Sequence, residues 1–124
     1  MKIVKSINFV PFYEKIREQK MPVILAYKLS KIYTKAKEDE EFYRNKLREI
    51  LLKYGETDEN GNFIPTEDGQ GVKIKAESQE ECVAAVNELQ EIESEIDFKP
   101  IDINDFANMD LTPSDLEGVI DFLA

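Results

Sequence analysis

Apolar side chains recur at alternating intervals of three and four residues along the stretch 22–54, which has no glycine and no proline after its first residue. This spacing lets an α-helix present one continuous apolar face. Gly55 follows as a stop signal. The pattern therefore predicts a long helix over residues 22–54, with only Asp39 interrupting the alternation. Its stripe consists of Leu25, Leu29, Ile32, Ala36, Tyr43, Leu47, Ile50 and Tyr54.

A helix of this length would extend about 50 Å at 1.5 Å per residue, more than a compact domain of this size covers. We expect it either to bend near residues 37–41 or to project as one arm of a hairpin. A second helix is predicted over residues 78–97, because Ser78 and Glu81 form a capping box and apolar residues recur every three or four positions after it. These are Cys82, Val86, Leu89, Ile92 and Ile96.

Between the two helices, residues 56–76 lose the helical pattern. The dipeptide Asn60-Gly61 favours a type I′ turn, in which both central residues have positive φ. Residues 62–64 and 72–75 flank a second turn-like cluster containing Gly69 and Gly71, and they have the composition of short antiparallel strands. The sequence therefore predicts a small β-hairpin at the tip of the helical hairpin.

The two ends of the chain carry weaker patterns. Loose alternation over residues 1–20 predicts a short strand or extended arm, followed by a short helix over residues 11–19. Ile101 and Ile103 alternate with polar residues and suggest an edge strand that could pair with this arm. Thr112-Pro113 is typical of a helix start, with Thr as cap and Pro in the first turn. A C-terminal helix with an apolar face should follow, formed by Leu116, Val119, Ile120 and Leu123.

With 124 residues, 42% of them hydrophobic, the chain is long enough for one modest core. We therefore predict a mostly α (α+β) fold in one domain, residues 1–124. It would be a long antiparallel helical hairpin with a small β-hairpin at its tip, a short N-terminal arm and a C-terminal helix. An extended segment and the final helix would occupy residues 98–124.

Charge is unevenly distributed along the chain. The 26 acidic and 16 basic residues give a net charge of −10, which argues against generic nucleic-acid binding. Residues 1–55 carry 13 Lys and Arg against 7 Asp and Glu, whereas residues 56–124 carry 3 against 19. Such asymmetry indicates either two oppositely charged binding surfaces or two halves that pack together and partly neutralise each other.

The residues needed for catalysis are sparse. Histidine is absent, which removes the commonest general base near neutral pH. Cys82 lies on an apolar stripe, so we expect it to be a core residue. The paired carboxylates lie on polar helix faces. We therefore expect no enzymatic activity and no cofactor.

One spacing resembles a calcium-binding loop, with Glu56, Asp58, Asn60 and Glu67 at the oxygen-ligand positions and Gly61 at the turn. The first ligand is Glu instead of the shorter Asp, and no second helix follows the loop. A plain acidic turn is therefore the favoured interpretation.

No stretch has the length of a signal peptide or a membrane span. The single cysteine cannot form an internal disulfide, which favours a reducing compartment. We therefore expect a soluble intracellular protein with no membrane contact.

The order of several short motifs resembles a family of small uncharacterised proteins encoded by bacteriophages and prophages of Gram-positive bacteria. The motifs are Met21-Pro22 before Leu25-Ala26-Tyr27-Lys28-Leu29, then Lys53-Tyr54-Gly55 with Asp58-Glu59-Asn60-Gly61-Asn62, and finally the Leu111–Leu116 run. The resemblance implies a phage or prophage origin, with a location in the host-cell cytoplasm or the virion, and carries no catalytic residues with it. A helical hairpin with a β-tip is also similar in architecture to a prefoldin subunit.

Three functional hypotheses follow. The first is a non-enzymatic phage or prophage protein that binds a protein partner, a second copy of itself included, in virion assembly or as an accessory factor. Its surface would include Lys31, Lys35 and Lys37. The second is an acidic decoy that occupies a nucleic-acid-binding site on a host defence or repair enzyme. Its surface would consist of Glu81, Glu88, Glu91 and Glu95. The third is a chaperone-like or oligomeric coiled-coil module.

Overall fold

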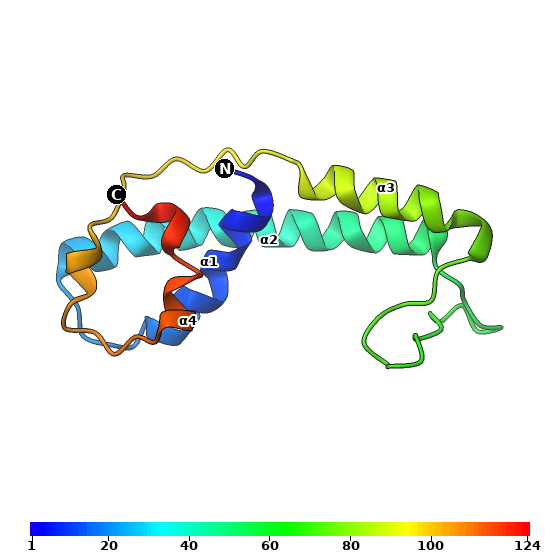
Figure 1. Cartoon of the computed structure of the whole chain (residues 1–124), viewed down its shortest axis with the longest axis horizontal. Helices are drawn as coiled ribbons and strands as arrows, with labels where there is room; N and C mark the ends of the chain where they lie inside the picture. Colours follow the sequence, from blue (N-terminus) through cyan, green and yellow to red (C-terminus); the bar gives the residue numbers. More distant parts are fainter. The chain divides into compact units, whose positions relative to one another are not determined.

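A computed structural model describes all 124 residues of the chain. The chain divides into two compact units: unit 1 comprises residues 1–41 and 93–124, and unit 2 comprises residues 42–92. The α-helices (Figure 1) are α1 (Ile3–Ile16), α2 (Val23–Tyr54), α3 (Gln79–Gln90) and α4 (Pro113–Leu116). Three 3₁₀-helices complete the secondary structure: η1 (Ala76–Ser78), η2 (Ile103–Phe106) and η3 (Ile120–Phe122).

The long helix predicted from the apolar stripe is confirmed as α2. It continues without interruption through residues 37–41, and the boundary between the two units falls just after them. At its C-terminal end the N–H of Gly55 donates to the carbonyl oxygen of Leu51 at 2.7 Å. A Cβ on residue 55 would lie 2.5 Å from that same oxygen, so the chain can leave the helix this closely only at a glycine.

The first segment of the chain forms α1, so the predicted strand or extended arm is wrong. Alternation of Ile7 and Phe9 with the polar residues Ser6 and Asn8 suggested a strand, but Ser6 is itself buried. Pro11 lies inside α1 instead of in a first turn, which leaves the helix short of one N–H donor. Contacts with the rest of unit 1 therefore outweigh the alternation and the proline, which favoured a strand followed by a helix starting at Pro11. The buried side chains of α1 are Ile3, Ser6, Phe9, Val10, Phe12 and Ile16.

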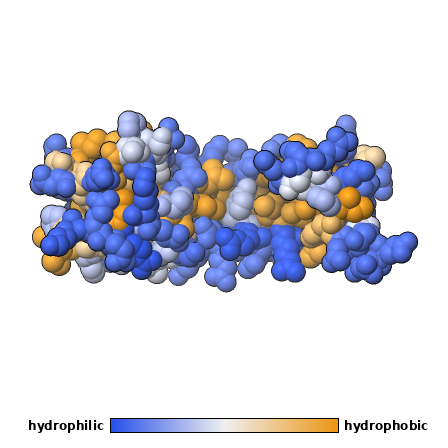
Figure 2. Space-filling view, turned by 90° about the horizontal axis from the view of Figure 1, so that it is seen from below, coloured by the Kyte–Doolittle hydropathy of each residue, from blue (hydrophilic) through white to orange (hydrophobic).

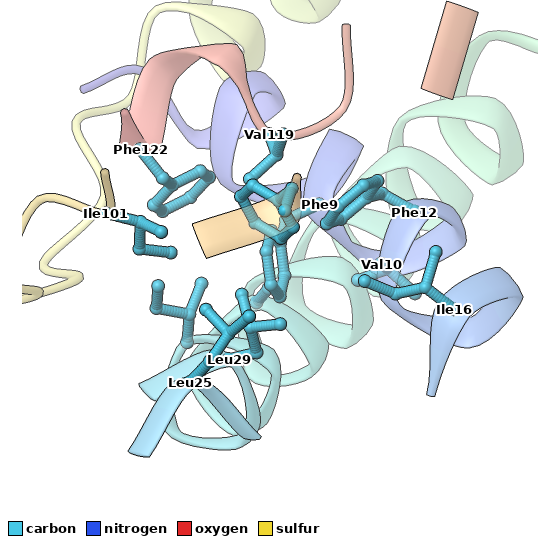
Figure 3. Close-up of a cluster of buried hydrophobic side chains, with 12 residues drawn as sticks. Phe9, Val10, Phe12, Ile16, Leu25, Leu29, Ile101, Val119 and Phe122 are labelled. Carbon is cyan, nitrogen blue, oxygen red and sulfur yellow. The ribbon is translucent and has the colours of Figure 1, made fainter. Parts of the chain in front are cut away.

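Unit 1 has an aromatic core, shown in Figure 3, in which α1, the first half of α2 and the C-terminal segment meet. The ring of Phe122 lies with its centroid 5.1 Å from that of Phe9 and 4.7 Å from that of Phe98. Tilted ring pairs at such distances add to the free energy gained by burial alone. From α2, the core receives the first four members of the predicted stripe: Leu25, Leu29, Ile32 and Ala36.

Asp39, the polar residue that interrupts the stripe, is only 7% exposed. Its Oδ2 accepts hydrogen bonds from the hydroxyls of Ser6 at 2.6 Å and Ser94 at 2.5 Å, and Lys35 Nζ lies 3.8 Å from its Oδ1. A buried carboxylate needs such partners to offset its lost hydration. Asp39 thus joins α2 to α1 and to the segment that follows α3.

The C-terminal segment begins as the sequence predicts and then departs from the prediction. Thr112 and Asp115 form a reciprocal capping box around Pro113. However, α4 ends after four residues, so the predicted C-terminal helix does not continue to Leu123. A Cβ on Gly118 would lie 2.8 Å from the Cβ of Phe12, so this glycine lets the segment lie directly on α1. The predicted edge strand at Ile101 and Ile103 is also wrong. Ile101 makes a single parallel bridge to Leu123, and Ile103 starts η2.

The small β-hairpin predicted at the tip is wrong, and with it the β part of the fold class. Residues 55–75 contain isolated bridges, at Thr57–Phe63 and Pro65–Val72 among others, but no strand or sheet. Pro65 has no N–H to extend the ladder. Of the two residues expected to adopt positive φ, only Gly61 does so, at 80°, because the Asp58 carboxylate caps this turn by accepting from the N–H groups of Asn60 and Asn62.

The second helix is shorter than the predicted range 78–97, since α3 ends at Gln90. Its buried face, Cys82 and Leu89, has the helical spacing, and Figure 1 draws α3 next to the C-terminal half of α2 within unit 2. The four acidic residues at positions 91, 93, 95 and 97 would have occupied the last turns of a longer helix, where its dipole disfavours negative charge. The chain continues there in a non-helical conformation.

The fold also redistributes the charge asymmetry. Unit 1 contains 10 Lys and Arg against 15 Asp and Glu, and unit 2 contains 6 against 11, so each unit has a net charge of −5. The acidic C-terminal segment returns to the basic N-terminal one within unit 1. Of the two interpretations of the asymmetry, partial neutralisation by packing is the one that the structure supports.

Candidate functional site

One hollow of unit 1 lies between α2 and the segment that precedes Pro100. It has a volume of about 520 Å³. Its α2 wall spans little more than two helical turns, and its other wall is three consecutive residues of the chain after α3. The lining residues are Ile24, Tyr27, Lys28, Lys31, Ile32, Asp97, Phe98 and Lys99.

The apolar part of this hollow is open to solvent. Ile24 is 72% exposed and Tyr27 is 63% exposed, and the neighbouring Val23 reaches 83%. These side chains lie on the face of α2 next to the core-facing stripe, and Ile32 of that stripe also lines the hollow. Elsewhere too the chain exposes hydrophobic residues: Figure 2, which views the molecule from below, shows them in orange among hydrophilic residues. Clusters of exposed apolar side chains with polar rims are typical of interaction sites.

Phe98 anchors the second wall. It is half-buried, and its ring packs edge-on against Phe122, which belongs to the core of unit 1. Three residues further on, the N–H of Ile101 donates to the carbonyl oxygen of Phe122 at 2.9 Å. The wall is therefore fixed to the core at its centre, while Asp97 and Lys99 on either side are exposed.

Three lysines surround the hollow, and the structure pairs none of Lys28, Lys31 and Lys99 with a carboxylate. Lys31 Nζ lies 5.3 Å from the centre of the Tyr27 ring, a cation–π geometry that leaves its charge available to a partner. Asp97 is the one acidic residue of the lining. The site is thus an apolar surface with a positive rim in a unit whose net charge is negative.

The other two lysines predicted for an interaction surface have partners within the chain. Lys35 lies 3.6 Å from a carboxylate oxygen of Glu38 and also contacts Asp39. Lys37 hydrogen-bonds to Glu40 at 3.0 Å, an interaction that raises the pKa of the Lys37 ammonium. Of the predicted set, only Lys31 therefore belongs to the hollow.

The four glutamates predicted for a decoy surface do not share a helix. Glu81 and Glu88 are exposed on α3 in unit 2, Glu91 follows the end of α3, and Glu95 lies in the non-helical segment of unit 1. The regular acidic array expected from a continuous helix is absent because that helix ends at Gln90.

Two of the four candidate calcium ligands, Glu56 and Asp58, are engaged in other interactions. Glu56 lies 3.6 Å from Lys73 Nζ, and one carboxylate oxygen of Asp58 accepts the two backbone hydrogen bonds of its turn. No group of three or more His, Cys, Asp or Glu side chains in the chain is placed to hold a metal ion. Asn60 and Glu67 are exposed in the two turns.

A second hollow, of about 390 Å³, lies between α1 and α4. The ammonium of Lys15 donates to Asp115 at 2.7 Å on its rim. This hydrogen bond, together with one from the backbone N–H of Thr112, holds the pKa of the Asp115 carboxyl below its ordinary value. Its one cation, Lys15, is paired with Asp115, so the hollow offers no free positive charge to a ligand.

Sequence reasoning missed most of the residues that line the first hollow. Ile24 and Lys28 lie off the apolar stripe of α2. Asp97 was predicted to end the second helix, and Phe98 and Lys99 to begin an extended segment. The available signal was the run Val23-Ile24, two apolar residues immediately before the stripe that its spacing does not use.

None of the helices combines the length and apolar character needed to span a membrane. Comparison of the chain with protein-family models, with curated proteins and with solved structures found no match.

Proposed function

We propose that this chain is a non-catalytic protein-binding module, and that the hollow between α2 and residues 97–99 docks an acidic, partly apolar segment of another protein. The observation that carries the proposal is the set of three lysines without carboxylate partners around an exposed apolar surface. We name Ile24, Tyr27, Lys28, Lys31, Phe98 and Lys99 the docking hollow.

The two kinds of side chain in the docking hollow would act differently. Burial of an exposed apolar side chain such as Ile24 contributes about 1.5–3 kcal/mol, so Ile24 and Tyr27 would supply most of the affinity. The lysines at the rim would steer an acidic partner to the site and reject basic ones, since charges at an interface rim act mainly on association rate and specificity.

Several features support a function without catalysis. The sequence has no histidine, and its one cysteine is buried in unit 2, whereas the docking hollow belongs to unit 1. The titratable side chains that line the hollow are the three lysines, Tyr27 and Asp97. No hydrogen bond joins a nucleophile and a base among them, as nucleophilic catalysis requires.

A phage or prophage origin stays a prediction, as do a role in virion assembly or as an accessory factor and a location in the host cytoplasm or the virion. The coiled-coil alternative also stays a prediction. The decoy alternative loses its main argument, because its four acidic residues do not form one array.

The proposal can be tested without knowing the partner. A randomised library of 12-residue peptides would be selected on the immobilised full-length chain, and the affinity of the enriched peptides measured by calorimetry. We expect acidic peptides with apolar residues. Their affinity should fall at least about tenfold, or 1.4 kcal/mol, in a K28E/K31E/K99E variant.

The matched control is a K20E/R48E/K75E variant, which makes the same change of charge at three other cations without carboxylate partners in the structure. This variant should bind the enriched peptides at close to wild-type affinity. Equal losses in both variants would show that net charge alone governs binding. Selection of peptides without acidic residues would also contradict the proposal.

A further inference from the structure

The wall of the docking hollow formed by residues after α3 has the alternation of a β-strand, although no second strand accompanies it. Ile92, Ser94, Ile96 and Phe98 are partly buried, whereas the residues between them are exposed. This period of two is characteristic of an extended segment that lies with one face on a core.

The inner edge of this segment is attached to the start of α1. The N–H of Ser94 donates to the carbonyl oxygen of Met1 at 2.9 Å, and Glu93 forms an antiparallel bridge with Lys2. The Ser94 hydroxyl donates to Asp39, and it also accepts from the N–H of Ile96 at 3.1 Å. With Ile101 bonded to Phe122 at its other end, the segment is held at both ends.

The opposite edge has no partner within the chain. In an extended segment alternate N–H groups point to opposite edges. Because the N–H of Ser94 points to Met1, those of Glu95, Asp97 and Lys99 point away from α1, and none of them makes a hydrogen bond in the structure. The carbonyl groups of residues 95–99 accept no backbone hydrogen bond either. Such an edge is a template for an added strand.

We infer that the docking hollow binds its partner as an extended peptide that pairs by backbone hydrogen bonds with residues 95–99. This inference rests on the proposed function and specifies its geometry. An added strand places alternate side chains on one face. Apolar side chains of the peptide would lie against Ile24, Tyr27 and Phe98, and acidic ones would reach Lys28, Lys31 and Lys99.

A helical partner is the competing arrangement, and the peptides enriched from the library distinguish the two. An added strand requires apolar residues at every second position, whereas a helix laid on α2 requires them at intervals of three and four. Enrichment of acidic peptides with the helical period would leave the proposed function in place and overturn this inference.

Substitution of Asp97 gives a sharper test of the backbone hydrogen bond that its N–H would donate to the added peptide. Asp97→Pro removes an N–H that makes no hydrogen bond within the chain, and the residue before it lies in the extended segment that a following proline favours. Asp97→Ala is the control for loss of the carboxylate. We expect the proline variant to bind an enriched peptide about threefold to tenfold more weakly than the alanine variant, the value of one net hydrogen bond.

Hydrogen exchange provides the second readout and does not depend on a substitution. In the wild-type chain, the amides of Glu95, Asp97 and Lys99 should exchange more slowly once the peptide is bound. Unchanged exchange at all three amides in a saturated complex, or equal affinity of the proline and alanine variants, would contradict strand addition. Folding of both variants would be verified by circular dichroism before the comparison.

Discussion

The two units of this chain are built in different ways. Of the 15 buried hydrophobic side chains, 13 belong to unit 1 and only Cys82 and Leu89 belong to unit 2. Unit 1 joins segments from both ends of the chain around an aromatic core, while unit 2 depends on half-buried apolar side chains and on turns closed by local hydrogen bonds. Segments with few buried contacts open at low free-energy cost, so unit 2 should be the less stable unit.

This difference bears on function, because a docking surface must be presented on a stable framework. The docking hollow lies entirely in unit 1, and its Phe98 wall rests on the core ring of Phe122. Unit 2 also exposes large apolar side chains, among them Phe42, Leu52 and Val83, but they are not gathered around a hollow with unpaired lysines.

The largest contrast is expected from truncation of core residues. Phe122→Ala should destabilise the chain by about 3–5 kcal/mol, because the aromatic core of unit 1 cannot collapse around the cavity. Leu89→Ala in unit 2 should cost about 2 kcal/mol, the lower end for leucine. Urea unfolding followed by circular dichroism would measure both, and a larger loss at Leu89 than at Phe122 would contradict the ranking of the two cores.

The buried polar group of unit 1 should give the next largest effect. Asp39→Ala removes the acceptor of the Ser6 and Ser94 hydroxyls, and buried polar groups left without a partner cost about 1–3 kcal/mol each. Glu38→Ala, one residue away and mostly exposed, removes another carboxylate near Lys35 and should change stability by less than about 0.5 kcal/mol. Similar losses from the two substitutions would show that Asp39 acts only through Lys35.

Substitution of one glycine in each unit by alanine tests how closely the backbone is packed there. In Gly118→Ala the new Cβ would meet Phe12 at 2.8 Å and the carbonyl oxygen of Asn8 at 2.9 Å, which should cost about 1–3 kcal/mol. Gly71 in unit 2 has no neighbour closer than 3.7 Å to such a Cβ, so Gly71→Ala should be neutral or stabilising by up to about 1 kcal/mol. Thermal unfolding of both variants checks this pair, and a stable Gly118→Ala variant would contradict the close approach of this segment to α1.

The smallest expected effect is on the pH dependence of the stability of the chain. Hydrogen bonds from Lys15 and Thr112 lower the pKa of Asp115 in unit 1, and hydrogen bonds from Thr66 and the N–H of Gln70 lower that of Asp68 in unit 2. A lowered pKa in the folded state stabilises the chain at pH values above the ordinary 3.8 of the carboxyl, and this contribution is lost as the pH falls through the folded value.

Asp115→Asn and Asp68→Asn should therefore each destabilise the chain slightly at pH 7 and have little effect near pH 2. Urea unfolding at the two pH values measures the difference. A destabilisation that persists unchanged at pH 2 would mean that the neutral carboxyl makes the same contacts, contrary to the charge-based explanation.

The sequence predicted those elements whose signals are local. The α2 stripe repeats over more than thirty residues, and the Thr112 cap needs only Asp115 three residues away, so both could be read directly. The predictions for α1, the end of α3 and the tip failed because distant contacts or hydrogen bonds of the turns decide them. Ser6 is buried through Asp39, 33 residues further on.

The docking hollow could not be predicted for the same reason. Its walls, Ile24 to Ile32 on α2 and Asp97 to Lys99, lie about seventy residues apart in the chain, and no periodic pattern connects them. The sequence also could not predict which lysines form ion pairs. Lys31, Lys35 and Lys37 all lie on the same helix among polar residues, yet of these three only Lys31 lacks a carboxylate partner in the structure.

The central claim is that unit 1, and not unit 2, presents the binding surface. Amide chemical shifts of the isotope-labelled full-length chain, recorded by NMR during titration with an acidic peptide from the library, test it most directly. We predict that the largest changes fall on residues 23–32 and 95–99, with residues 42–92 nearly unchanged. Changes centred on Phe42, Leu52 and Val83 would contradict the account and place binding on unit 2.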